Sequence, residues 1–310
     1  MPIDAPTRLL LGSGPSPVPE RVLAAAAQPT VGHLDPWFSD LMQDTAAALR
    51  RVMRTENRAT LPISGTGSAG MEAAFANVVE PGDRVLVAVN GYFGRRMVDM
   101  AGRYGGDVRC LEAEWGTAFS FEELEQGLLT HRPQVLALVQ AETSTGVGQP
   151  LGGLAELCRA HDCLLLVDTV TSLGGAPLFV DAWGIDIAHS GSQKCLSAPS
   201  GLSPLTFGPR ALDKLAKARE LGVAVCGVPA LVPCRVSSRE TSPVGVALHD
   251  LTSGSRRFIA SHVSKAVARP ISASKSTRAP TRTGRHRSAH NVSLPRNGAC
   301  SLHASRPAAF

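Results

Sequence analysis

The stretch "GIDIAHSGSQKCLSAPSG" (residues 184–201) joins an apolar run to a turn that holds one isolated lysine. Residues 185–190 have the composition of a buried strand, and Ser, Gly, Gln and Pro surround Lys194 in the turn. A lysine acts as a nucleophile when its amine loses a proton near neutral pH, which requires a desolvated site or a nearby positive charge. A lysine among small residues meets that requirement better than a solvated one. Lys194 is therefore the first candidate for a catalytic residue.

Residues 60–208 alternate between short apolar runs and helical patterns, which is typical of an α/β fold with a mainly parallel sheet. The pattern predicts helices at 68–79, 92–105, 120–131 and 151–162. The third of these begins with a capping box formed by Ser120 and Glu123. Strands are predicted at 60–64, 84–89, 107–111, 134–140, 163–168, 185–190 and 203–208.

The segment "GTGSAG" (65–70) lies between a predicted strand and a predicted helix and matches the G-x-G-x-x-G pattern of dinucleotide sites. That fingerprint also needs an acidic residue after the next strand, where this chain has Asn90 and Gly91. The missing acidic residue counts against an NAD site. The amides of a helix start, together with the hydroxyls of Thr66 and Ser68, could still hold a phosphate. A tight turn that binds nothing fits this loop equally well.

Asp168 ends the most apolar predicted strand, "CLLLVD" (163–168). Ligands of open α/β sheets bind beyond the carboxyl ends of the strands, although this carboxylate could equally cap the segment that follows it. Lys194 comes after the next strand, so both groups can face one crevice. A carboxylate opposite a pyridinium nitrogen and a Schiff-base lysine are what a protein provides to pyridoxal phosphate. The phosphate cup, the aspartate and the lysine, in that order, therefore suggest pyridoxal 5′-phosphate as cofactor.

Several longer segments carry a family resemblance: "LLLGSGPSPVP", "VGHLDPWF", "ISGTGSAGMEAAFANVVEPGDRVLV", "NGYFGRR", "STGVGQPL", "LLLVDTVTSLGGAPL" and "GIDIAHSGSQKCLSAPSGLS". Together they resemble the alanine–glyoxylate and serine–glyoxylate aminotransferases, which are class V, fold-type I enzymes dependent on pyridoxal phosphate. The resemblance runs from about residue 8 to about residue 215. It implies a large domain with a mainly parallel, seven-stranded sheet flanked by helices, and a homodimer. It also implies transamination between alanine or serine and glyoxylate or another 2-oxo acid.

Carried over by position, the resemblance makes Lys194 the Schiff-base lysine and Asp168 the partner of the pyridine nitrogen. Ser68 stands where the family often has a histidine that contacts the cofactor, and Phe93 stands where the family often has the tryptophan that stacks on its ring. The other implied contacts are Thr66, Gly67 and Gln193 for the phosphate, Thr143 for the 3-oxygen side of the ring, and Gly14 with Pro15 for the substrate.

Taken one at a time, these residues have ordinary structural interpretations. Phe93 alone is more typical of a core residue than of a cofactor contact, and Thr143 and Gln193 alone are typical of solvated loops. His189 is interpreted as a hydrogen-bonded structural histidine without an assigned role, and Cys195 as a small packing residue.

The carboxy-terminal part has a different composition. Residues 251–310 contain nine Arg, two Lys and none of the chain's 26 acidic residues. Such a segment buries too little apolar surface to offset its ordering entropy. We expect three regions: an arm at 1–20, a cofactor-binding large domain at 21–218 and a poorly ordered basic segment at 219–310. The family's small domain is expected to be missing or replaced there, and a frameshifted reading of the gene is one hypothesis that resequencing the DNA would test.

Two alternative functions stay open. The first is an inactive or weakly cofactor-binding remnant, because in the family the small domain carries the arginine that binds the substrate carboxylate. The second is another fold-type I enzyme, such as a cysteine desulfurase-like protein or a phosphonate transaminase, although "GSQKCLSAPSG" favours the glyoxylate branch. Specific nucleic-acid binding is not expected, because Phe258 and Phe310 are the only aromatic residues beside the basic charges of the last 60 positions.

The sequence composition also bears on the cellular location of the protein and on whether it binds a metal ion. There is no apolar run of membrane-spanning length and no convincing signal peptide. The seven cysteines are scattered without a CxxC pair, so neither a zinc site nor a disulfide framework is expected. These features predict a cytoplasmic protein without a metal site.

Overall fold

The computed structural model describes residue 6 and residues 8–220. The helices in this part of the chain are α1 (Glu20–Ala26), α2 (Pro36–Met53), α3 (Gly67–Val78), α4 (Tyr92–Arg103), α5 (Phe121–His131), α6 (Leu154–Ala160) and α7 (Pro209–Glu220). The strands are β1 (Ala59–Ser64), β2 (Arg84–Val89), β3 (Asp107–Glu112), β4 (Val135–Val139), β5 (Ala141–Glu142), β6 (Val147–Gly148), β7 (Leu164–Asp168), β8 (Ile187–His189) and β9 (Leu202–Phe207).

Seven of these strands form one mixed sheet in the order β1-β9-β8-β7-β4-β2-β3. The five strands from β8 to β3 pair in parallel, and β9 runs antiparallel to both of its neighbours. Because β9 separates β1 from β8, β1 has the same direction as the parallel strands. Their carboxyl ends therefore lie at one edge of the sheet.

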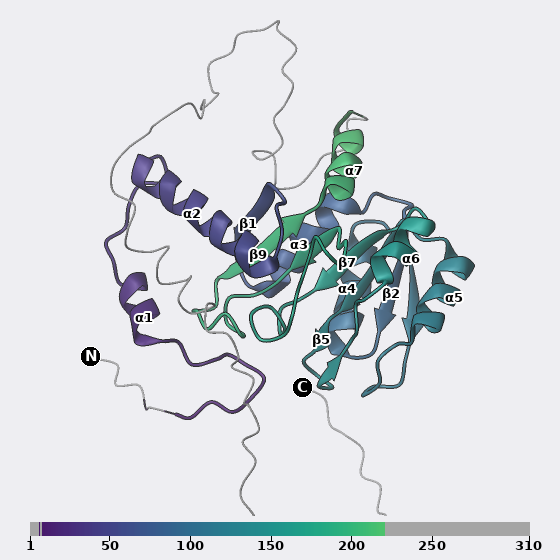
Figure 1. Cartoon of the computed structure of the whole chain (residues 1–310), viewed down its shortest axis with the longest axis horizontal. Helices are drawn as coiled ribbons and strands as arrows, with labels where there is room; N and C mark the ends of the chain where they lie inside the picture. Colours follow the sequence, from purple (N-terminus) through teal and green to yellow (C-terminus); the bar gives the residue numbers. More distant parts are fainter. Residues whose placement is uncertain (1–5, 7, 221–310) are drawn as a thin grey trace, which may run out of the picture. The chain divides into compact units, whose positions relative to one another are not determined.

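Helices cover both faces of the sheet (Figure 1). Side chains of α3, α4 and α7 pack with one set of strand residues, and side chains of α5 and α6 pack with the other set. The two sets alternate along β4, where Val135, Ala137 and Val139 join the first core and Leu136 and Leu138 join the second. This alternation follows from the two-residue period of a strand and explains why β4 and β7, which are covered on both faces, are buried along their whole length.

The connections place a topological switch point at β2, between β4 and β3. Strand β2 pairs with β3 on one side and with β4 on the other, so the chain reverses its direction of travel across the sheet after β3. Helix α4 leaves β2 and packs in the first core, whereas α5 leads into β4 and packs in the second. Ligands of open α/β sheets bind beyond the carboxyl ends of strands at such a switch point.

The predicted α/β fold is confirmed, with each predicted strand and helix present within a few residues of its expected bounds. The capping box is present as well, because Ser120 and Glu123 exchange hydrogen bonds at the start of α5. Helices α1, α2 and α7 and the short hairpin of β5 and β6 were not predicted. The prediction for 219–310 falls almost entirely on residues outside the described part of the chain. Within that part, no helix is long and apolar enough to cross a membrane.

Candidate active site

The segments that follow β1, β2, β4, β7 and β8 bring most of the predicted site residues to the carboxyl edge of the sheet. Thr66, Gly67 and Ser68 follow β1, Phe93 follows β2, Thr143 follows β4, Asp168 ends β7, and Gln193 and Lys194 follow β8. The register places Asp168 beside Val139 of β4 and beside His189 of β8. The sheet itself therefore collects residues that are far apart in the sequence.

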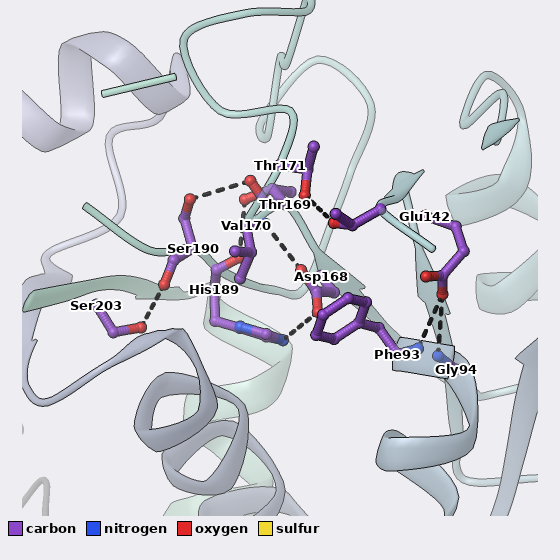
Figure 2. A network of polar contacts seen from close by, with 11 residues as sticks. Phe93, Gly94, Glu142, Asp168, Thr169, Val170, Thr171, His189, Ser190 and Ser203 are labelled. Atoms are coloured by element: carbon purple, nitrogen blue, oxygen red, sulfur yellow. Dashed lines mark hydrogen bonds and ion pairs between the residues drawn. The ribbon is translucent and has the colours of Figure 1, made fainter. Parts of the chain in front are cut away.

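Asp168 is a buried carboxylate, with 2% of its surface exposed. Its Oδ1 accepts a hydrogen bond of 2.8 Å from the backbone N–H of Val170, and its Oδ2 lies 3.7 Å from Nε2 of His189 (Figure 2). Burial raises the pKa of Asp168, while the nearby His189 and Lys194 oppose that increase. A buried carboxylate of this kind is stabilised by a cationic partner, which no described side chain supplies at hydrogen-bond distance.

Lys194 lies against the amino-terminal segment of the chain. Its Nζ donates a hydrogen bond of 2.9 Å to the carbonyl oxygen of Ser13. The backbone N–H of Ser16 donates a second hydrogen bond, of 2.8 Å, to the carbonyl oxygen of Gln193. Gly14 packs on the lysine so closely that a Cβ there would lie 2.5 Å from Lys194 Cδ and 2.9 Å from Nζ. Pro15 follows on the exposed side. The predicted substrate residues thus border the predicted nucleophile.

The glycine loop leads into α3 next to the turn that follows Asp168. A Cβ at Gly67 would lie 3.0 Å from a methyl group of Val170, so a side chain there would require Val170 to shift. Thr66 occupies the N-cap position, yet its hydroxyl makes no capping hydrogen bond and its side chain is exposed. Ser68 lies in the first turn of the helix. Hydroxyls and backbone N–H groups at a helix start are groups that can hydrogen-bond an anion.

Gln193 and Thr143 occupy neighbouring parts of the same edge. The buried Oε1 of Gln193 has no hydrogen-bond partner within the described residues. The hydroxyl of Thr143 is hydrogen-bonded to the hydroxyl of Thr171, a residue of the turn after Asp168. The Thr143 hydroxyl therefore links the turn after β4 to the turn after Asp168.

Phe93 is positioned by a buried glutamate that the sequence did not single out. One carboxylate oxygen of Glu142 accepts hydrogen bonds from the N–H groups of Phe93 at 3.1 Å and Gly94 at 3.2 Å, at the start of α4 (Figure 2). The other oxygen accepts from the backbone N–H and the hydroxyl of Ser144, at 3.1 Å and 2.7 Å. Glu142 thus joins the turn that carries Phe93 to the one that carries Thr143.

His189 is the other residue whose importance was missed. Its side chain is fully buried, and in the described part of the chain neither ring nitrogen has a hydrogen-bond partner. The interpretation of a hydrogen-bonded structural histidine was therefore wrong. Cys195 was likewise expected to fill space, but it is exposed and its Sγ donates to Thr171 O at 3.2 Å. The only sequence signal for His189 was its place, the last residue of a strand that precedes the lysine turn.

The start of α3, the buried carboxylate of Asp168 and the amine of Lys194 thus follow three strands whose carboxyl ends lie at the same edge of the sheet. The family model for the class-V aminotransferases matches residues 8–228. The chain belongs to the class-V aminotransferase family. Among similar proteins, the alanine–glyoxylate aminotransferase of Callithrix jacchus is 47% identical over 214 residues, 69% of this chain and 52% of that protein.

Two further relatives show the same likeness. The (S)-ureidoglycine–glyoxylate transaminase of Bacillus subtilis (strain 168) is 43% identical over 221 residues, which is 71% of this chain and 53% of the relative. The solved structure of an alanine–glyoxylate aminotransferase from Nostoc sp. superimposes with a TM-score of 0.71 at 56% identity, covering 73% of this chain and 59% of that one. This class-V aminotransferase chain thus spans about half the length of the relatives it matches.

Within the described residues, no group of His, Cys, Asp and Glu side chains is arranged to hold a metal ion.

Proposed function

We propose that this chain is a pyridoxal 5′-phosphate-dependent aminotransferase that moves an amino group from alanine or serine to glyoxylate or another 2-oxo acid. The observation that carries the proposal is Asp168, a buried carboxylate beside Lys194 without a cation at hydrogen-bond distance in the described structure. Membership of the class-V aminotransferases, with relatives that are named as glyoxylate aminotransferases, supports the choice of reaction.

The residues present fit the cofactor in three respects. Asp168 needs a positively charged N–H, and a protonated pyridine ring provides one. In the described part of the chain, the side-chain amide of Gln193 accepts no hydrogen bond at its buried Oε1, and its NH2 group carries the donors that a phosphate would need. The hydroxyl of Thr66 is free of any capping role at the start of α3, where helix amides favour a phosphate.

The proposed contacts follow from these positions. Asp168 would pair with the ring nitrogen and favour its protonated form. Phe93 and Thr143 would contact the ring. Thr66, Gly67, Ser68 and Gln193 would hold the phosphate.

The bound cofactor supplies an electron sink for negative charge at the substrate's Cα. Lys194 would provide the amine that attaches the cofactor and, once released, the base that takes a proton from the substrate's Cα. Its hydrogen bond to Ser13 O must be released for this role, because the amine cannot serve both partners. Gly14 and Pro15 border the lysine and would contact the bound amino acid.

We also propose that the protein acts as a homodimer. Helix α1 buries none of its residues, and several apolar side chains near the amino terminus are exposed: Leu9 at 81%, Leu11 at 84%, Leu34 at 78% and Trp37 at 51%. Grouped exposed apolar side chains are typical of protein interfaces. Sedimentation velocity would support this assembly by a mass of twice the 32.5 kDa chain and contradict it by a monomer at micromolar concentration.

Residues 21–218 are proposed to be the cofactor-binding large domain and residues 1–20 an arm. A cytoplasmic location is proposed because the described cysteines Cys110, Cys158, Cys163 and Cys195 are all free thiols.

Turnover tests the proposed reaction. The full chain, loaded with pyridoxal 5′-phosphate, should convert alanine and glyoxylate to pyruvate and glycine, and serine and glyoxylate to hydroxypyruvate and glycine. Lys194→Ala should lack this activity, whereas the exposed Lys217→Ala should keep it. Retention of the cofactor without any turnover would contradict the proposed reaction and favour the alternative of a cofactor-binding remnant.

A further inference from the structure

His189 is the one buried ionisable side chain at the carboxyl edge of the described sheet whose polar atoms have no hydrogen-bond partner there. The surrounding groups are paired: the hydroxyl of Thr169 donates to His189 O at 2.8 Å, and the hydroxyl of Ser190 donates to Thr169 O at 3.0 Å (Figure 2). The backbone of His189 is thus fixed while its ring has no partner. Buried polar atoms without partners are rare and costly, so each one calls for a reason.

The ring is aimed at Asp168. Strands β7 and β8 are parallel neighbours, and their register puts Asp168 directly beside His189 (Figure 2). Nε2 of the histidine lies 3.7 Å from Oδ2 of the aspartate, which is beyond the usual limit of about 3.2 Å for such a hydrogen bond. Because Val170 N–H already holds Oδ1, the free side of the carboxylate is the one that His189 approaches.

The charges around Asp168 and His189 favour a neutral imidazole at position 189. Burial lowers the pKa of His189, and the Asp168 carboxylate opposes that decrease. Burial raises the pKa of Asp168, Glu142 raises it further, and Lys194 lowers it. A neutral imidazole has one N–H donor and adds no charge, so it can support a carboxylate without competing with a cationic ring.

We propose that His189 is a positioning residue for Asp168: its neutral ring donates the Nε2 proton to Oδ2 when the carboxylate engages the cofactor's ring nitrogen. Val170 and His189 then hold the two oxygens, which fixes the orientation of the carboxylate and keeps it ionised. This inference rests on the proposed function, because Asp168 has that task only in a pyridoxal 5′-phosphate enzyme. His189 touches neither substrate nor cofactor in this account and acts through Asp168.

Two substitutions of His189 test whether it acts as a hydrogen-bond donor or only fills space. His189→Gln keeps an amide N–H in the region of Nε2, and His189→Leu keeps apolar volume without a donor. His161→Gln, at the end of α6, is the control, because that residue precedes β7 and lies at the opposite end of the strand from Asp168. Thermal melting of each full-length variant shows whether it is folded.

The loaded full chain should show a kcat for alanine and glyoxylate about 10-fold lower in His189→Leu, with KM changed less than about twofold, as expected for the loss of one hydrogen bond to a charged group. His189→Gln should recover most of that kcat, and His161→Gln should match the wild type. If His189 only fills space, kcat should not fall while KM stays unchanged, and His189→Gln should not recover the kcat that His189→Leu loses.

A second readout does not depend on activity. Long-range ¹H–¹⁵N spectra of the ¹⁵N-labelled wild type should show a neutral His189 with its proton on Nε2, and the Nε2 signal should move when pyridoxal 5′-phosphate is added. The same signal should not move in Asp168→Asn. If His189→Leu does not fold, the spectra of the wild type and of Asp168→Asn test the proposal without it.

The proposal is overturned if folded His189→Leu equals the wild type in kcat, or if the proton resides on Nδ1 and is insensitive to Asp168→Asn. A wild-type chain that binds no cofactor has a different meaning, because it refutes the proposed function and this inference with it.

Discussion

Glu142 offers the sharpest test of how the site is held together, because it connects two of its turns. The Glu142→Ala substitution removes the acceptor for four donors: the N–H groups of Phe93, Gly94 and Ser144, and the Ser144 hydroxyl. Glu142 is 1% exposed, so water cannot fully replace the lost oxygens. The start of α4 and the turn with Thr143 should both become less ordered.

The magnitude follows from the unpaired donors. Each buried donor left without a partner costs about 1–3 kcal/mol, and water that enters the new space offsets part of this. We therefore expect the free energy of unfolding to fall by about 2–4 kcal/mol, a large share of the ~5–15 kcal/mol that is typical of a folded domain. Glu142→Gln should lose less, because one oxygen acceptor remains.

Urea unfolding followed by circular dichroism measures this difference, provided the slope of the transition is unchanged. The matched control is Glu125→Ala, an exposed position on α5 whose loss should change stability by less than about 0.5 kcal/mol. The affinity for pyridoxal 5′-phosphate should also fall in Glu142→Ala, because Phe93 is no longer fixed. A Glu142→Ala variant as stable as the control, with unchanged cofactor affinity, would refute the reasoning.

Two other predictions concern the lysine and the aspartate. Gly14→Ala should reduce cofactor attachment at least 10-fold, because a φ of +135° strains any residue with a Cβ and because that Cβ would displace the end of the Lys194 side chain; Gly12→Ala, which has open space, should not. The yield of the borohydride-reduced adduct measures this, and equal yields would contradict it. Asp168→Asn should stabilise the cofactor-free chain at pH 7 by about 1–3 kcal/mol, the cost of a buried unpaired polar group, because Asn still accepts from Val170 N–H. Folding raises the pKa of Asp168, so the stability gained by Asp168→Asn should shrink as the pH falls through that raised pKa and the wild-type carboxyl becomes neutral. The urea midpoints of the two proteins should therefore converge at low pH, and midpoints that stay apart would contradict this prediction.

Much of the fold could be predicted from the sequence because a parallel sheet leaves a strong local signal. The central strands are apolar runs such as "CLLLV", and one of the helices between the strands has a clear start signal at Ser120. Asp168 was recognisable because it ends such a run, and Lys194 because it is the only charged residue of the turn that follows residues 185–190. Helices α1 and α2 were missed because they precede the alternating segment of residues 60–208 on which the prediction rested, and α1 also buries none of its residues.

Glu142 and His189 could not be found in this way, because their roles depend on contacts between distant segments. Glu142 is one acid in the loop "AETSTG", and only the fold brings it to the start of α4, 49 positions earlier in the chain. The sequence shows that His189 ends a strand, but the absence of a partner for its ring appears only when β7 and β8 are paired.

The most direct test of the central claim is to find where the cofactor becomes attached. The purified full chain is mixed with pyridoxal 5′-phosphate, reduced with borohydride, digested and analysed by mass spectrometry. The account predicts one reduced adduct, on Lys194, that is absent in Lys194→Ala and present in Lys217→Ala. An adduct that is missing from the wild type, or that forms equally on other lysines, would contradict it.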